Sequence, residues 1–343
     1  MNCWVFIHSH HHLNMALALS ERNPNRDFIF ISGKPQSDDF IKRIPAKIKY
    51  LQTKEDSTKG FFSVEKRYKE IVMTLKNMDD PDEIITFYDT FSGFLYLKHI
   101  FRIKWCQVSL IEDGLANFIA ISMPSFFNRV IKASINFFLN RYLVPTSFLS
   151  LGHNKHICKI YSSWPEKVSA HNSMKIINIK KEYEEVLDSL SSNEWISGNK
   201  LSLNHMDIVM IPPLLTTRNL SKKKIFSFLS DLFYLLENKA KIYIKLHPSE
   251  GKELQEFIEE FLNSKSLSVS FLSPKTPIEY YFANLKTFSL TGSPSTSHLI
   301  AVNNFSKKLI GDAIIIPDHS NPFSKKHLGF LGGIKRLKIS EVL

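Results

Sequence analysis

Short apolar runs, of the kind that form buried strands, alternate along the chain with longer segments that have a helical period. In the first part of the chain the strand-like runs lie at residues 3–9, 27–33, 47–51, 83–89 and 106–112. Helical patterns, such as those at 14–22 and 61–77, separate them. Strands joined by crossovers of this length predict a parallel sheet with helices on both faces.

The alternation stops once and then resumes. Residues 124–150 are apolar and aromatic with isolated basic side chains, and the polar stretch at 161–175 is typical of a linker. Further strand-like runs follow at 207–215, 241–248, 267–273, 285–292 and 307–317, with helical patterns at 221–238, 252–263, 276–283 and 295–303. Two successive Rossmann-like domains, 1–165 and 166–343, explain this order most simply. We therefore expect an α/β protein with a cleft between its domains, at the carboxyl ends of the strands.

Composition and charge narrow the class of protein. The chain has 343 residues, of which 43% are hydrophobic, and a net charge of +11, which predicts attraction to a nucleotide, an acidic lipid surface or a nucleic acid. Neither zinc-finger spacing nor an aromatic-basic ribonucleoprotein signature is present, which argues against nucleic acid. Cys3, Cys106 and Cys158 are far apart and odd in number, so we expect free thiols in a reducing compartment.

The sequence predicts a cytoplasmic protein, because it shows neither a secretory signal pattern nor a run of about 18 apolar residues. Residues 124–150 leave two interpretations open. Their many phenylalanines could form a buried pair of helices on the N-terminal domain. Together with Arg129, Lys132 and Arg141, they could instead form an interfacial helix on an anionic leaflet, which predicts peripheral attachment to the cytoplasmic face of the inner membrane.

The first candidate chemistry lies in VSLIEDGLANFIA, residues 108–120. Glu112 and Asp113 directly follow an apolar run and precede Gly114, so both carboxyl groups belong at the carboxyl edge of the predicted sheet. An ordinary helix cap is the simpler explanation. Neighbouring residues at a strand end point in opposite directions, so one acid should face the ligand and the other should support it. The sequence leaves open which acid does which.

The second candidate lies in KIYIKLHPSEGK, where the alternating pattern predicts a strand closed by His247 and Pro248. Lys245, two positions earlier, is predicted on the same side of the strand as His247. A titratable donor beside a cation suits an anionic leaving group such as a phosphate. The alternative is an ordinary half-buried histidine.

The third candidate lies in SLTGSPSTSHLIAVNN, where hydroxyl side chains lead into a predicted helix. Ser293, Ser295 and Thr296 surround that helix start and could bind a phosphate, although Ser295 could equally cap the helix. Glu279, in the first turn of an earlier predicted helix, is either a solvated residue or a carboxylate that binds a ribose diol.

Together these residues resemble the bacterial sialyltransferases of the GT-B type, which include the lipooligosaccharide sialyltransferases and the capsule polysialyltransferases. Glu112–Gly114 matches the D/E-D/E-G motif of that family, and His247–Pro248 matches its His-Pro motif. Ser295–Thr296 fits the paired-hydroxyl motif, with Ser293 leaving the register open, and Glu279 resembles the nucleotide-contacting glutamate.

The resemblance implies a GT-B fold with an N-terminal acceptor domain and a C-terminal CMP domain. It implies inverting transfer from CMP-sialic acid to a galactose-terminated glycan of lipooligosaccharide, O-antigen or capsule, on a lipid carrier in some cases. Glu112 or Asp113 would act as the base, and His247 would assist the leaving phosphate with Lys245, Ser295 and Thr296. The remaining motif residues, Gly114, Pro248, Glu279 and Ser293, would bind substrate. We expect neither a cofactor nor a metal, because CMP is a monophosphate leaving group.

Three other functions remain open: another nucleotide-sugar or polyol-phosphate transferase, a sugar-nucleotide epimerase of similar architecture, and a basic module that binds membranes or nucleic acid. Two further stretches invite metal hypotheses. The histidine run at 8–12 is predicted to be a loop that helps to bind donor or acceptor. The acidic stretch at 78–83 precedes a strand, so it belongs at the wrong end of the sheet and is predicted to be a solvated loop.

Overall fold

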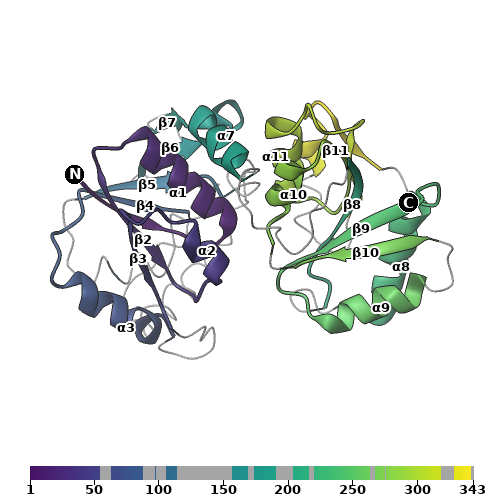
Figure 1. The fold of residues 1–343 in the computed structure, drawn as a ribbon, viewed down its shortest axis with the longest axis horizontal. Helices are drawn as coiled ribbons and strands as arrows, with labels where there is room; N and C mark the ends of the chain where they lie inside the picture. Colours follow the sequence, from purple (N-terminus) through teal and green to yellow (C-terminus); the bar gives the residue numbers. More distant parts are fainter. Residues whose placement is uncertain are drawn as a thin grey trace, which may run out of the picture. The chain divides into compact units, whose positions relative to one another are not determined.

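The computed structural model describes residues 1–54, 63–87, 97, 106–113, 157–168, 174–190, 204–215, 220–262, 267–274, 276–317 and 328–340. The chain divides into two compact units, Met1–Val186 and Leu187–Leu343. Each unit is built on a parallel sheet that carries helices (Figure 1). Gly114 and the aromatic segment 124–150 lie outside the described residues, so the expectations for both stay predictions.

The first unit holds a seven-stranded sheet in the order β3-β2-β1-β4-β5-β6-β7. Its strands are β1 (Asn2–Phe6), β2 (Asp27–Ser32), β3 (Lys49–Gln52), β4 (Glu83–Thr86), β5 (Gln107–Ile111), β6 (Ile157–Ser162) and β7 (Lys175–Asn178). Its helices are α1 (His10–Arg22), α2 (Asp38–Lys42), α3 (Ser63–Leu75) and most of α7 (Lys180–Ser189), which crosses the boundary between the units, and a 3-10 turn covers Pro165–Lys167. All the neighbouring strands pair in parallel, as the crossover pattern predicts.

The polar stretch 161–175 is not simply a linker. It begins inside β6 and ends where β7 starts, and both strands extend the first sheet. The division between the units therefore falls at 186/187, later than the 165/166 boundary that composition suggests. The polar character of β6 has a physical reason, because Lys159 and Tyr161 both contact the buried carboxylate of Glu83.

The second unit holds a six-stranded sheet in the order β10-β9-β8-β11-β12-β13. Its strands are β8 (His205–Ile211), β9 (Lys241–Leu246), β10 (Ser268–Leu272), β11 (Thr287–Gly292), β12 (Ala313–Ile315) and β13 (Leu337–Ile339). Its helices are α8 (Lys222–Tyr234), α9 (Lys252–Leu262), α10 (Ile278–Asn284) and α11 (Thr296–Asn304). Apolar side chains of α8 and α9, such as Leu229 and Ile258, pack in one cluster with Ile242 and Ile244 of β9.

Both sheets reverse their strand order once, between β1 and β4 in the first unit and between β8 and β11 in the second. In open parallel sheets of this kind, ligands bind outside the carboxyl ends of the strands at such a reversal. Both units are Rossmann-like, with a parallel sheet that carries helices, so the predicted α/β class with two Rossmann-like domains is confirmed. Within the part of the chain that the structure describes, no helix is long and apolar enough to cross a membrane.

Candidate active site

The two adjacent acids after β5 have different surroundings. The Glu112 side chain is buried, and its Oε2 accepts hydrogen bonds from Ser162 Oγ at 2.5 Å and Ser163 N at 2.9 Å. Burial raises the pKa of the Glu112 carboxyl, while the hydrogen bonds from the two serines act in the opposite direction. Glu112 therefore ties the end of β5 to the end of β6, which suits a supporting acid.

Asp113 lies where a ligand could reach it. Its side chain is 20% exposed, and its Oδ1 lies 2.6 Å from Nε2 of His12, whose side chain is only 5% exposed. The His12 ring stacks on Phe87, with ring centroids 4.2 Å apart. Phe87 directly follows β4, and His12 belongs to the helix after β1. The three residues thus meet at the strand reversal of the first sheet.

The histidine run is not the loop that we expected from the sequence. Helix α1 begins at His10, and the Ser9 side chain caps it by accepting the His12 N–H. Successive residues of a helix point about 100° apart, so the three histidines meet different partners. His10 contacts Arg43, His11 contacts Tyr183, and His12 contacts Asp113. We did not predict from the sequence that the three histidines have different partners, although a serine before the first residue of a helix is a recognisable helix start.

His11 also contacts the peptide group between the two acids. Its Nε2 lies 3.1 Å from the Glu112 carbonyl oxygen, and its Nδ1 lies 3.0 Å from the Tyr183 hydroxyl. Burial is the main cause that lowers the pKa of His11 to about 4, and the neighbouring His12 adds to it. A neutral His11 ring can donate to the carbonyl and accept from the tyrosine at once.

In the second unit, His247 and Pro248 directly follow β9, as predicted, and both are exposed. The His247 N–H donates to the Ile211 carbonyl oxygen, which fixes the end of β9 against β8. Its ring Nδ1 accepts the Ser249 N–H at 3.2 Å and lies 2.7 Å from Ser249 Oγ. These contacts assign the ring proton to Nε2, so that His247 can donate through this atom.

Lys245 is buried, unlike His247. Its Nζ donates to the carbonyl oxygens of Ser273 and Pro274, at 2.8 and 2.9 Å, and so ties β9 to the turn after β10. Burial lowers the pKa of Lys245 to about 8, and the charge of Glu279 opposes that shift. Glu279 is itself buried, in the first turn of α10. The structure thus brings these two predicted residues together.

The hydroxyl-rich stretch lies at the end of β11, at the strand reversal of the second sheet. Gly292 has φ +153°, and a Cβ there would lie 2.3 Å from the Met210 carbonyl oxygen, so glycine is required. The buried Ser293 Oγ has no hydrogen-bond partner among the described residues. Ser295 is the N-cap of α11, and Thr296 is the first residue of that helix.

The side chain of Ser295 does not cap the helix, which was the alternative to a ligand-binding role. Its Oγ lies instead 2.9 Å from Nδ1 of His298, a residue that the sequence did not single out. Burial lowers the pKa of His298 to about 4, so that this ring is neutral at physiological pH. His298 therefore holds the Ser295 hydroxyl beside the helix start.

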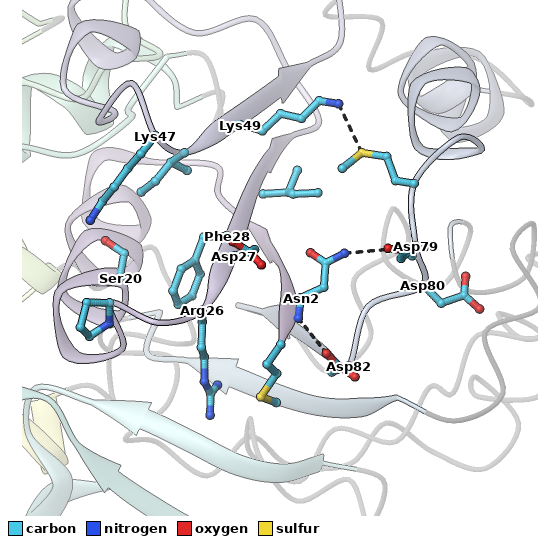
Figure 2. Close-up of a pocket in the computed structure, with 15 residues that line it drawn as sticks. Asn2, Ser20, Arg26, Asp27, Phe28, Lys47, Lys49, Asp79, Asp80 and Asp82 are labelled. Atoms are coloured by element: carbon cyan, nitrogen blue, oxygen red, sulfur yellow. Dashed lines mark hydrogen bonds between the residues drawn. The ribbon is translucent and has the colours of Figure 1, made fainter.

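A pocket of about 600 Å³ lies in the first unit at the amino ends of the strands, opposite the strand ends that carry Glu112 and Asp113 (Figure 2). Residues 78–82 lead into it just before β4, at the amino ends of the strands, as predicted. Glu83 is not part of a solvated loop, because it is the first residue of β4 and is buried. The lining is of mixed charge: Asp79 and Asp80 share it with Arg26, Lys47 and Lys49. Among the described residues, no cluster of three or more histidine, cysteine or acidic side chains could hold a metal ion.

Comparison with known proteins identifies relatives. The family model described as alpha-2,8-polysialyltransferase (POLYST) matches residues 5–308. No curated protein sequence matches the chain. Among solved structures, the Methanocaldococcus jannaschii UDP-GlcNAc 2-epimerase in complex with UDP-GlcNAc and UDP is similar, with 15% identity and a TM-score of 0.57 over 99% of this chain and 89% of the other. The S. aureus MnaA–UDP structure has 9% identity and a TM-score of 0.55 over 92% and 79%. At such identities the likeness concerns the fold alone.

Proposed function

The chain belongs to the alpha-2,8-polysialyltransferase family, and from this membership we propose that it transfers sialic acid from CMP-sialic acid to a glycan hydroxyl. Membership of this family makes it a glycosyltransferase. The donor and the acceptor are the parts that we propose. The epimerase hypothesis rests on a shared fold alone, which hosts several chemistries.

Two observations bear on the acceptor, and they point to different glycans. The family description names an α-2,8 linkage, which would make the acceptor a hydroxyl of a preceding sialic acid. The sequence motifs alone suggest a galactose-terminated glycan, and a lipid-linked one would explain the aromatic segment 124–150. We propose the sialylated glycan as the main acceptor and the galactoside as the alternative.

In the proposed reaction, Asp113 is the general base. The acceptor oxygen bonds to the anomeric carbon of sialic acid, and its proton passes to the Asp113 carboxylate. The bond between that carbon and the CMP phosphate oxygen breaks, and the electron pair leaves with the phosphate. Removing a general base typically costs about 10²–10⁴-fold in rate. The partial exposure of Asp113 favours it over the buried, serine-bound Glu112.

The CMP phosphate would bind in the second unit. We propose that His247 donates its Nε2 proton to the leaving phosphate, because its Nδ1 is occupied by Ser249. Ser293, Ser295 and Thr296 would bind the nucleotide at the start of α11. Lys245 would act through the turn that it holds, and Glu279 would contact the ribose. The His247→Ala variant should lose turnover more than CMP affinity, because its bond strengthens as charge develops.

The observation that carries this proposal is the family match over residues 5–308, and the partly exposed Asp113 at the strand reversal of the first sheet supports its chemistry. The test measures CMP release from CMP-sialic acid alone, with a galactoside, and with an α-2,8-sialylated oligosaccharide. We expect release that depends on an acceptor and is largest with the sialylated one. Conversion of UDP-GlcNAc to its 2-epimer, without release of CMP from CMP-sialic acid, would overturn the proposal in favour of an epimerase. Failure to bind CMP would overturn it in favour of a binding module.

A further inference from the structure

The His12 ring is held on three sides. Its Nδ1 accepts the backbone N–H of His8 at 3.2 Å, and its face stacks on Phe87 with the two ring planes 17° apart. Its Nε2 lies 2.6 Å from Asp113 Oδ1. The capped first turn of α1 fixes the backbone that carries the ring. These contacts fix the orientation of the His12 ring, so its Nε2 already faces the Asp113 carboxylate before any ligand binds.

These contacts assign the position of the ring proton. A backbone N–H can only donate, so the Nδ1 that faces it must be the acceptor. The proton of the neutral ring is therefore on Nε2 and is donated to the Asp113 carboxylate. The same logic excludes His12 as the base, because the Nε2 lone pair that would take a proton from the acceptor is not present in this tautomer.

The neighbouring histidine holds the backbone at the same point. His11 is neutral and donates from Nε2 to the Glu112 carbonyl oxygen, while the Tyr183 hydroxyl donates to its Nδ1. The Glu112 carbonyl belongs to the peptide group that also contains the Asp113 nitrogen. The first turn of α1 thus fixes both the backbone and the side chain of Asp113.

We propose that His12 is a positioning residue that holds the Asp113 carboxylate, through its Nε2–H, in the orientation that receives the acceptor proton. This inference rests on the proposed role of Asp113 as the base. His12 keeps its own proton throughout, so the bonds that form and break are those of the transfer reaction. A small misplacement of a reacting group can cost about 10²-fold in rate, which sets the scale of the effect.

The first test compares His12→Phe, which keeps an aromatic ring beside Phe87 but removes the donor, with His12→Gln, whose amide can donate. The control is Glu21→Gln, at an exposed position in the last turn of the same helix. We expect His12→Phe to lower kcat by about 10–100-fold with unchanged CMP affinity. His12→Gln should recover part of that loss, and Glu21→Gln should retain the wild-type kcat.

Wild-type turnover in His12→Phe would overturn the inference, and so would equal losses in His12→Gln and His12→Phe at unchanged melting temperatures. Asp113→Asn separates this failure from that of the proposed function. If Asp113→Asn stays active, the base assignment itself is wrong. If it is inactive while His12→Phe is active, only the positioning role fails.

A second measurement stands even where His12→Phe fails to fold. Nitrogen-15 NMR of histidine-labelled wild-type protein reports the tautomer of each ring, with the His12 signals assigned by their loss in His12→Gln. We expect the Nε2–H tautomer for His12. An Nδ1–H tautomer or an imidazolium in the wild-type protein would overturn the inference.

Discussion

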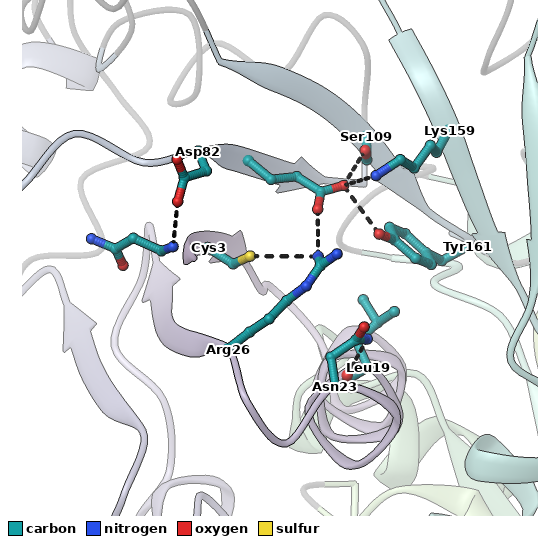
Figure 3. A network of polar contacts seen from close by, with 10 residues as sticks. Cys3, Leu19, Asn23, Arg26, Asp82, Ser109, Lys159 and Tyr161 are labelled. Atoms are coloured by element: carbon teal, nitrogen blue, oxygen red, sulfur yellow. Dashed lines mark hydrogen bonds and ion pairs between the residues drawn. The ribbon is translucent and has the colours of Figure 1, made fainter.

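The first sheet carries one carboxylate at the amino ends of its strands (the amino edge) and another at their carboxyl ends (the carboxyl edge), each beside cationic or titratable partners. The two carboxylates differ in their exposure to solvent. At the amino edge Glu83 is completely buried and accepts from Arg26 at 2.8 Å, Ser109 at 2.5 Å and Tyr161 at 3.1 Å (Figure 3). Lys159 adds an ion pair at 3.5 Å. At the carboxyl edge Asp113 keeps a fifth of its side chain exposed.

This difference shows why a carboxylate with a basic partner is not by itself an active site. The donors around Glu83 come from residues before β2 and from β5 and β6, so that carboxylate joins strands across the sheet. A substrate could not reach it without breaking those bonds. Asp113 combines a fixed partner with access to solvent, and this combination suits a base that must take a proton from a ligand.

The largest effect that the comparison predicts is on catalysis. Asp113→Asn should lower kcat/KM by about 10²–10⁴-fold, because the amide cannot accept the proton. Glu83→Gln should leave the kcat of the folded fraction unchanged. Steady-state kinetics, with the folded fraction taken from circular dichroism, measure both. Equal catalytic losses in the two variants would contradict the inference that Asp113 is catalytic and Glu83 is structural.

The next effect is on stability. Glu83→Ala removes the shared partner of Arg26 and Lys159 and should lower the free energy of unfolding by about 3–5 kcal/mol. Urea denaturation measures it. Asp80→Ala is the matched control, because Asp80 is an exposed acid of the same edge. If both substitutions cost the same, Glu83 does not join the strands as we infer.

A smaller effect concerns Glu112, whose pKa is raised by burial from the usual 4.5. In the folded state Glu112 keeps its proton to higher pH than in the unfolded chain. Its contribution to stability is therefore fully present below pH 4.5 and is lost as the pH rises through the folded-state pKa. The stability of Glu112→Gln relative to wild type should thus increase as the pH rises from 4.5 to neutral. Urea denaturation across this range checks it, and a flat or falling difference would contradict it.

The smallest effect concerns the pocket at the amino edge. Lys49→Ala should change the free energy of unfolding by less than about 0.5 kcal/mol, because Lys49 is exposed and contacts only Met78 among the described hydrogen-bond partners. Transferase activity should stay at the wild-type level. A large loss of activity would show that this pocket, and not the carboxyl edge alone, contributes to the reaction.

Much of the fold follows from local pattern. The predicted strands at 27–33, 106–112 and 241–248 overlap β2, β5 and β9, because parallel strands buried on both faces form continuous apolar runs. The sequence did not predict β6 and β7, because these strands lie in or beside a polar stretch and form no continuous apolar run. The polar side chains of β6 have partners that only the folded sheet supplies, so the sequence alone cannot distinguish this strand from a linker.

For the candidate site, too, the sequence predicts some features and only the structure shows the others. Sequence spacing places Glu112 and Asp113 at the carboxyl edge, because residues that follow a buried strand must leave the sheet there. It places His247 at the end of β9 by the same argument. It could not tell which acid is buried, because Ser162 and Ser163, the partners of Glu112, lie about fifty residues further along the chain.

The sequence by itself determined the two parallel sheets and the strand ends that carry the acids and the histidine, because hydrophobic period and strand-breaking residues act over a few neighbouring positions. Only the tertiary structure decided that Asp113 meets His12, since the two are 101 residues apart and are joined by the strand order β1-β4-β5. A helix cap at Ser9 turns one histidine of the run toward Asp113 and another toward Tyr183. Such contacts depend on which strands become neighbours, which the local pattern of residues does not specify.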